Sequence, residues 1–168
     1  MMCKLSGAKI AVAVCCVLAL AACSKKNTPN LEAANAGISG ATSAPGTAGD
    51  FAANVGDRIY FQVDQASLTA EGEDTLRKQA AWLQQYPGVS IQVEGHSDER
   101  GTREYNIALS ARRATAAREF LIAQGVEASR ISSIAYGKER PAALCDAEQC
   151  WSQNRRAVTV ITGGARTS

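Results

Sequence analysis

The chain contains four short segments in which apolar and polar residues alternate. In one of them Val89, Ile91 and Val93 are separated by polar residues. A period of two predicts a strand that buries one of its faces. The four predicted strands are residues 58–63, 89–94, 131–136 and 156–161.

Two longer segments between these strands carry apolar residues at helical spacing. In the first, Leu76, Ala80 and Leu83 form one stripe, Thr69 suits the N-cap position, and Pro87 ends the pattern. The second pattern is closed by a glycine that suits a helix C-terminus. The two predicted helices are residues 69–86 and 103–124.

The order of these elements is βαβαββ, which predicts an α/β fold with one mixed sheet. Each strand–helix–strand unit implies parallel pairing, because the chain has to cross back over the sheet before the next strand. The last two strands have no helical pattern between them and suggest an antiparallel hairpin. Helices packed on the sheet would complete a two-layer α+β sandwich.

The segment ahead of these elements has the pattern of an export signal. Lys4 and Lys9 precede an apolar run over residues 10–19, and small residues stand before Cys23. The run is too short for a transmembrane helix, which needs about 20 apolar residues. The residues Leu20-Ala21-Ala22-Cys23 resemble a bacterial lipobox, in which the cysteine is acylated and the chain is cut before it. The alternative is an ordinary signal peptide with an incidental cysteine.

The lipobox resemblance implies a mature chain that begins at Cys23 and is held on a membrane by acyl chains. Ser24 stands where an aspartate would signal inner-membrane retention, so the expected location is the periplasmic face of the outer membrane. Small and polar residues dominate the next part of the chain, which predicts a flexible tether with a span of roughly 30 Å. The predicted divisions are a leader at 1–22, a lipidated N-terminus and tether at 23–50, and one folded domain at 51–168.

Charge and cysteine content narrow the possible functions. Removing Lys4 and Lys9 from the 18 basic residues balances the 16 acidic ones, which argues against nucleic-acid binding. Of the six cysteines, Cys145 and Cys150 are the pair left outside the leader and the lipidation site. An even pair in an oxidising compartment predicts a disulfide, with two free thiols as the alternative. Two thiols without a nearby histidine do not complete a metal site.

The second predicted helix carries two adjacent arginines with different surroundings. On a wheel of about 100° per residue, Arg113 falls inside the apolar arc with Asn106 beside it, whereas Arg112 falls on the polar side. A buried guanidinium needs an anionic partner, and Asp98 in the preceding loop is the candidate. Together with helix N–H groups this pair would offer both signs of charge to a zwitterionic ligand. The alternative is a structural salt bridge that fixes the loop.

The residues around this pair resemble the peptidoglycan-binding signature of outer membrane protein A-like domains. The resemblance rests on Gly95-His96-Ser97-Asp98-Glu99-Arg100-Gly101-Thr102, on Glu104-Tyr105-Asn106, on Arg112-Arg113-Ala114 and on Asn154-Arg155-Arg156-Ala157-Val158. It covers roughly residues 57–161 and implies an outer membrane protein A-like fold without enzymatic activity. The implied ligand is the diaminopimelate side chain of the peptidoglycan stem peptide.

The resemblance also implies roles for individual residues. Asp98 and Arg113 stand at the family's aspartate and arginine, and Asp64 matches another position near the pocket. With Asn106 beside Arg113, these are the four residues expected to bind the ligand. Arg103 departs from the family, which often has a proline at the start of this helix. The residues Asn154, Arg155 and Arg156 are interpreted as mainly structural, with ligand contact as the alternative.

Together with the lipobox, the resemblance implies a protein that links the outer membrane to the cell wall. It also implies docking to TolB and the Tol complex, with a role in envelope integrity and cell division. One alternative is an interaction module whose main ligand is TolB, bound through loops 98–103 and 136–151. A second alternative is a peptidoglycan hydrolase built on His96, Ser97 and Asp98 or on neighbouring carboxylates. Three consecutive residues do not easily form a catalytic triad, so we expect no enzyme and no cofactor.

Overall fold

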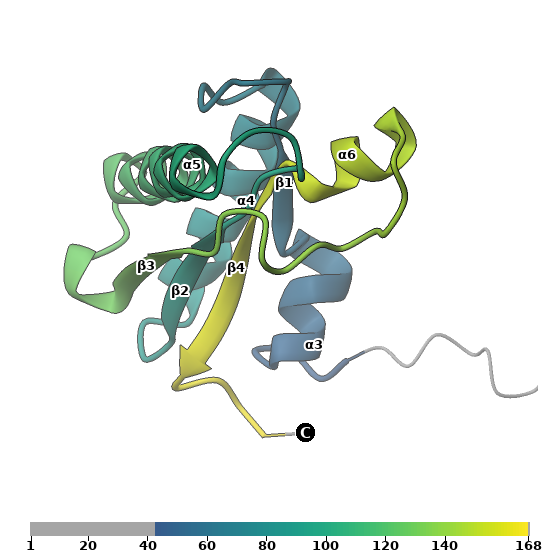
Figure 1. The fold of residues 1–168 in the computed structure, drawn as a ribbon. Helices are drawn as coiled ribbons and strands as arrows, with labels where there is room; N and C mark the ends of the chain where they lie inside the picture. Colours follow the sequence, from purple (N-terminus) through teal and green to yellow (C-terminus); the bar gives the residue numbers. More distant parts are fainter. Residues whose placement is uncertain (1–42, 168) are drawn as a thin grey trace, which may run out of the picture. The chain divides into compact units, whose positions relative to one another are not determined.

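The structure of the protein, a computed structural model, describes residues 43–167 (Figure 1). The predicted leader at 1–22, the lipidation site Cys23 and most of the predicted tether at 23–50 lie outside these residues. Within residues 43–167, none of the helices has the length and hydropathy of a membrane span.

The described part begins with a helical segment that the sequence pattern did not predict. It consists of the turn α3 (Ala48–Asp50) and the π-helical η1 (Phe51–Val55). Asp50 is buried and accepts hydrogen bonds from the Trp82 indole at 2.9 Å and from the Gly46 N–H at 2.9 Å. Folded structure therefore begins inside the span that composition alone assigned to the tether.

Four strands form one mixed sheet in the order β1-β4-β2-β3. Strands β2 and β3 pair in parallel, as predicted, whereas β4 lies between β1 and β2 and is antiparallel to both. The predicted hairpin of the last two strands is therefore wrong. A hairpin needs a short turn, whereas residues 136–155 form a long connection that carries the chain across the sheet. The strands are β1 (Arg58–Tyr60), β2 (Ser90–Gly95), β3 (Ile131–Ala135) and β4 (Arg156–Gly163).

The insertion of β4 also changes how β1 and β2 relate. Both strands are antiparallel to β4, so they run in the same direction, as the strand–helix–strand pattern predicts. They do not pair with each other, because β4 occupies the position between them. The direction of these strands was readable from the sequence, but their adjacency was not.

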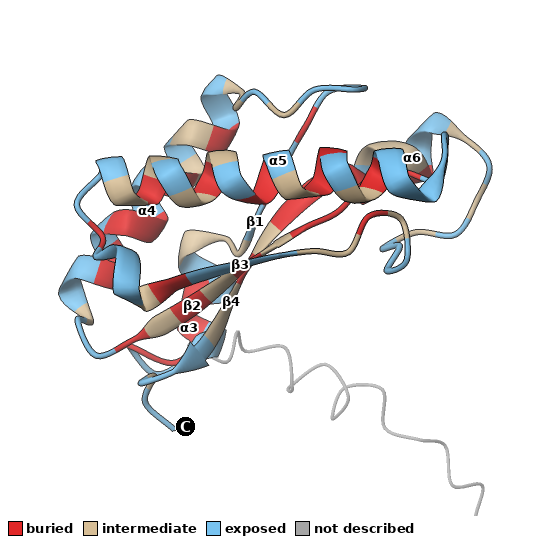
Figure 2. Ribbon diagram, turned by 60° about the vertical axis from the view of Figure 1, so that its left-hand side comes forward, coloured by how far each residue is buried: buried red, intermediate tan, exposed pale blue. Residues whose placement is uncertain are grey.

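The two predicted helices are confirmed, and they cover the same side of the sheet (Figures 1 and 2). Their N-caps are threonines: Thr69 accepts a hydrogen bond from the Gly72 N–H, and Thr102 accepts one from the Tyr105 N–H. A short helix near the C-terminus was missed because its seven residues show no apolar stripe. The helices are α4 (Ala70–Gln85), α5 (Arg103–Ala123), the 3₁₀ turn η2 (Ala128–Arg130) and α6 (Glu148–Asn154).

The hydrophobic core lies between the sheet and the two long helices (Figure 2). Strand β2 alternates between buried and half-buried residues along its length, which confirms the period of two read from the sequence. Its buried side chains, Ile91 and Val93, pack with apolar residues of α4 and α5 such as Leu83 and Leu121. This packing holds the middle and the C-terminal half of α5 against the sheet.

Gly95 marks the closest approach of β2 to α5 and provides a stability test. A Cβ at this position would lie 1.9 Å from the backbone carbonyl oxygen of Ser110, which cannot rotate away. We expect Gly95→Ala to lower the free energy of unfolding by about 3 kcal/mol, the upper end of the usual cost of overpacking. Gly163→Ala is the matched control, since, its chain neighbours apart, no heavy atom of the described residues lies within 4 Å of a Cβ there. Equal urea midpoints for the two variants would contradict this close approach.

The predicted disulfide between Cys145 and Cys150 is present, with the two Cα atoms 5.6 Å apart. It closes a short loop at the start of α6. We expect the double serine variant to lose about 2 kcal/mol of unfolding free energy, because the open loop gains chain entropy in the unfolded state. Urea unfolding of the parent with and without reductant checks this. An unchanged midpoint after reduction would contradict a stabilising role.

Candidate functional site

A cleft of about 340 Å³ lies between the loop after β1, the loop after β2 and the first half of α5. All four residues predicted to bind a ligand line it, although they come from three separate parts of the chain. The lining residues are Val63, Asp64, Asp98, Arg100, Gly101, Tyr105, Asn106, Leu109 and Arg113. The structure thus brings the predicted residues together, and their part in binding stays a prediction.

Arg113 lies at the base of the cleft and its side chain is fully buried, as the helical wheel predicted. Its guanidinium donates hydrogen bonds to three backbone carbonyls, those of Gln65 (2.8 Å), His96 (2.9 Å) and Gln62 (3.2 Å). The predicted ion pair with Asp98 is wrong, because these carbonyls from two loops supply the acceptors. A guanidinium has five N–H groups; three make these bonds, one each from Nε, Nη1 and Nη2, and two make none within the described residues.

Arg113 carries its positive charge in this surrounding. Burial lowers the pKa of Arg113 to about 10, while the negative charge of Asp98 acts in the opposite direction. The guanidinium is therefore protonated at neutral pH. The adjacent Arg112 is exposed on the polar side of α5, as predicted, so the two arginines form a natural pair for comparison.

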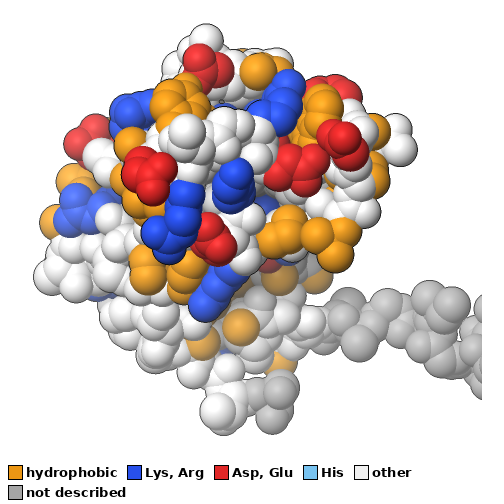
Figure 3. Space-filling view, viewed as in Figure 1, with side chains coloured by type: hydrophobic (Ala, Val, Ile, Leu, Met, Phe, Trp, Pro, Cys, Tyr) orange, Lys and Arg blue, Asp and Glu red, His pale blue; other side chains and the backbone are white. Residues whose placement is uncertain are grey.

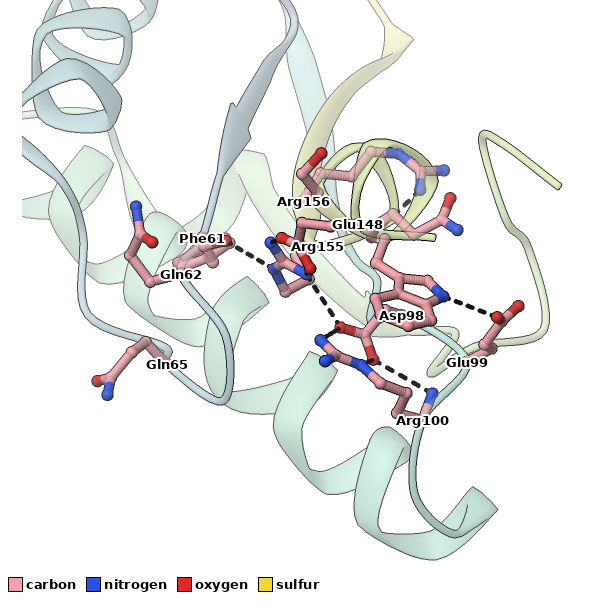
Figure 4. Close-up of polar contacts among 12 residues, drawn as sticks. Phe61, Gln62, Gln65, Asp98, Glu99, Arg100, Glu148, Arg155 and Arg156 are labelled. Carbon is pink, nitrogen blue, oxygen red and sulfur yellow. Dashed lines mark hydrogen bonds and ion pairs between the residues drawn. The ribbon is translucent and has the colours of Figure 1, made fainter. Parts of the chain in front are cut away.

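Asp98 pairs with two other arginines (Figure 4). Its carboxylate accepts hydrogen bonds from Arg100 Nη2 at 2.6 Å and from Arg155 Nη1 at 3.2 Å. Burial alone would raise the pKa of Asp98, but the hydrogen bonds from Arg100 and Arg155 outweigh it and leave that pKa below its ordinary value. The carboxylate is therefore ionised at neutral pH.

Sequence reasoning missed both partners of Asp98. Arg155 lies far along the chain, so no local spacing pointed to it, whereas Arg100 is only two residues away and its charge could have been noticed. Arg155 also donates to the Phe61 carbonyl at 3.2 Å and pairs with Glu148 of α6. Figure 4 shows Arg155 between the end of β1, Asp98 and α6.

The residues beside Arg155 bind backbone groups of the protein. The Asn154 side chain accepts hydrogen bonds from the N–H groups of Ala142 and Ala143. Arg156 donates to the carbonyls of Asn154 and Arg140. These contacts account for the conformation of the connection that leads into β4.

Asn106 and Tyr105 connect α5 to the two loops around the cleft. Asn106 is buried and donates from Nδ2 to the carbonyl of Arg100 at 2.8 Å, which holds the loop after β2 against the helix. The Tyr105 hydroxyl donates to the carboxylate of Asp64. Asp64 has φ of 59°, a left-handed conformation that aspartate tolerates better than most residues. These contacts place two carboxylates, Asp64 and Asp98, at the same cleft.

His96 and Ser97, the residues of the alternative hydrolase hypothesis, are both buried. Neither imidazole nitrogen of His96 nor the Ser97 hydroxyl has a hydrogen-bond partner within the described residues. Burial, followed by the charges of Arg156 and Arg140, lowers the pKa of His96 to about 4, so the ring is neutral at pH 7. Among residues 43–167 no group of three or more His, Cys, Asp or Glu side chains is placed to hold a metal ion.

The charges of the cleft are balanced rather than of one sign. Asp64 and Asp98 stand against Arg100 and Arg113 on its lining. Figure 3 shows acidic and basic side chains intermixed on the face of the molecule seen in Figure 1. The first turn of α5, capped by Thr102, adds backbone N–H groups that favour an anion. A ligand that carries one ammonium and one carboxylate complements this set better than a simple anion or cation.

The chain is similar to known proteins over nearly its whole length. Residues 60–156 match the OmpA family. A peptidoglycan-associated lipoprotein of Mesorhizobium japonicum is 56% identical over 155 residues, which cover 92% of each chain. One of Agrobacterium fabrum is 57% identical over 162 residues, covering 95% of this chain and 91% of that protein.

Solved structures agree with the fold. The crystal structure of the peptidoglycan-associated lipoprotein from Burkholderia pseudomallei is 39% identical, with a TM-score of 0.62, and the match covers 63% of this chain and 90% of that one. The C-terminal domain of Helicobacter pylori MotB is 24% identical, with a TM-score of 0.60, and covers 64% of this chain and 84% of that one. The second likeness concerns the fold alone.

Proposed function

This chain belongs to the OmpA family, and from that premise we propose that it is an outer-membrane lipoprotein that binds peptidoglycan non-covalently. The names of its relatives, peptidoglycan-associated lipoproteins, support this function over most of the chain. The observation that carries the proposal is the charge-balanced cleft, which is lined by both Asp98 and Arg113.

The ligand that fits this cleft is the free end of a diaminopimelate side chain, which carries an ammonium and a carboxylate on one carbon. The ammonium would lie at the carboxylates of Asp98 and Asp64. The carboxylate would accept hydrogen bonds from the two unused N–H groups of Arg113 and from the first turn of α5. A stem peptide with lysine in place of diaminopimelate lacks the carboxylate and would lose the second set of contacts.

The remainder of the proposed function concerns attachment to the membrane. Acyl chains on Cys23 would insert into the outer membrane and anchor the protein there. The segment up to about residue 50 would span the distance to the wall. Each molecule needs only moderate affinity for the wall, because many attachments along the same two surfaces act together. The supporting observations are the lipobox-like sequence and the relatives' description as lipoproteins.

The chemistry of the cleft favours binding over catalysis. Glycoside hydrolysis requires a carboxylic acid whose pKa is raised, so that it can donate a proton near neutral pH. The pKa of Asp98 is lowered instead, because Arg100 and Arg155 stabilise its charged form. We therefore propose that the protein leaves the wall intact.

Co-sedimentation with purified sacculi tests this proposal. We expect the chain to pellet with sacculi that contain diaminopimelate, to be released by an excess of free meso-diaminopimelate, and to pellet poorly with lysine-type sacculi. Failure to pellet with either type of wall would refute peptidoglycan binding. Release of soluble muropeptides into the supernatant would refute the non-enzymatic part.

The partnership with TolB and the Tol complex is a further part of the proposal, and it rests on the family resemblance. The two loops expected to contact TolB, residues 98–103 and 136–151, touch each other. Lys138 donates to the carbonyls of Glu99 and Gly101, and Arg103 pairs with Glu139 at 3.1 Å. The first of these loops contributes Asp98, Arg100 and Gly101 to the cleft, so TolB bound there should exclude wall peptide. Simultaneous retention of both in a pull-down would contradict a shared surface.

A further inference from the structure

The acceptor positions of Asp98 are fully used within the protein. Two oxygens of a carboxylate offer about four lone-pair sites. Oδ1 accepts from the Arg100 backbone N–H at 3.2 Å and from Arg100 Nε at 3.3 Å. Oδ2 accepts from Arg100 Nη2 at 2.6 Å and from Arg155 Nη1 at 3.2 Å. An incoming ammonium therefore finds no free acceptor on Asp98 unless one of these donors leaves.

The donors differ in their freedom to leave. Arg155 has only 5% of its side chain exposed and is held by the Phe61 carbonyl and by Glu148. The Arg100 backbone N–H is fixed by the loop, since Asn106 binds the carbonyl of the same residue. The Arg100 side chain, in contrast, is 41% exposed and supplies two of the four hydrogen bonds. It is the donor that a ligand can displace.

A tryptophan of α6 supports the Arg100 side chain from the other side. The Arg100 guanidinium carbon lies 4.3 Å from the centroid of the Trp151 ring, within the range of a cation–π contact. The Trp151 indole N–H donates to Glu99 Oε1 at 2.7 Å, which orients the ring. Trp151 directly follows Cys150, so the disulfide fixes the start of the helix that carries it. The position of Arg100 over Asp98 is therefore stabilised by groups that do not line the cleft.

We propose that Arg100 is an internal competitor for Asp98: its guanidinium occupies the place of the ligand's ammonium and must swing aside when the ligand binds. Trp151 is then a positioning residue, which acts through Arg100 by favouring the occupied state. In its present position the guanidinium already feels the negative charges of Glu148 and Glu99, and either carboxylate could receive it when it leaves Asp98. This inference rests on the proposed binding of a zwitterionic wall peptide.

The competitor role predicts that removing Arg100 strengthens binding. We expect Arg100→Gln to raise the affinity for a diaminopimelate-containing muropeptide by about threefold, because a partly exposed ion pair contributes little and its loss frees two acceptor positions on Asp98. Trp151→Leu should also raise this affinity. The double variant, Arg100→Gln with Trp151→Leu, should bind no more tightly than Arg100→Gln alone. Arg112→Gln, on the exposed side of α5, is the matched control and should leave the affinity unchanged.

A chemically blocked ligand separates competition from a general effect of charge or structure. Acetylation of the side-chain amine removes the ammonium, so the gain from Arg100→Gln should disappear with this ligand. Titration calorimetry on the full chain measures each affinity. Weaker or unchanged binding of the Arg100→Gln variant, with intact binding by the parent, would overturn the competitor role and leave the proposed function standing. Absence of binding by both the parent and the variant would refute the proposed function itself, and the competitor role with it.

Discussion

Replacing Asp98 with asparagine should abolish co-sedimentation with sacculi. The amide has the same shape but no negative charge, so the ligand's ammonium would lose its main partner. We expect an affinity loss of at least about 30-fold, because removing one member of a desolvated charge pair costs about 2 kcal/mol or more. Calorimetry with a soluble muropeptide gives the loss as a number.

The Asp98→Asn variant should keep its fold, because Arg155 retains the Phe61 carbonyl and Glu148 as acceptors. Asp74→Asn is the matched control, since Asp74 is an exposed acid of α4 that pairs with Arg77 of the same helix. Full binding by a folded Asp98→Asn variant would show that the carboxylate is not the ammonium site.

Arg113→Lys should reduce both stability and binding. Lysine keeps the charge but cannot direct N–H groups at three separate carbonyls. We expect the free energy of unfolding to fall by about 3 kcal/mol, since each poorly satisfied buried acceptor costs about 1–3 kcal/mol. We also expect at least a tenfold loss of affinity for a muropeptide, because lysine cannot make the proposed bidentate contact with its carboxylate.

Arg112→Lys is the control for this change, because Arg112 is the next residue in the helix and is exposed. It should alter the free energy of unfolding by less than about 0.5 kcal/mol, as surface substitutions usually do. Urea unfolding of both variants checks the contrast. Equal losses of stability for the two would contradict the structural role of Arg113.

The sequence pattern identified the elements better than their arrangement. Alternation in β2 and the threonine caps of α4 and α5 were readable, because each depends on neighbours within a few residues. The insertion of β4 between β1 and β2 depends on pairing between distant segments and on a long connection, for which no local signal exists. Helix α6 is too short and too polar to show a periodic stripe.

The sequence predicted which residues meet at the candidate site, but not which of them form ion pairs and hydrogen bonds with one another. The helical wheel correctly separated buried Arg113 from exposed Arg112, because burial follows the periodicity of α5. The expectation that Arg113 needs an anionic side chain overlooked backbone carbonyls, which can satisfy a buried guanidinium without a formal charge. Asp98 instead takes Arg155, which only the folded topology brings near it.

The location of a bound wall peptide tests the central claim most directly. An isotope-labelled, non-acylated chain starting at Ser24 can be titrated with a diaminopimelate-containing tripeptide and followed by NMR. We predict that the largest shifts occur at Asp64, at residues 98–106 and at the Arg113 side chain. A second cavity of about 660 Å³ lies beside Tyr60 and Gln153. Shifts confined to that cavity, with the cleft of Asp98 unchanged, would contradict the account.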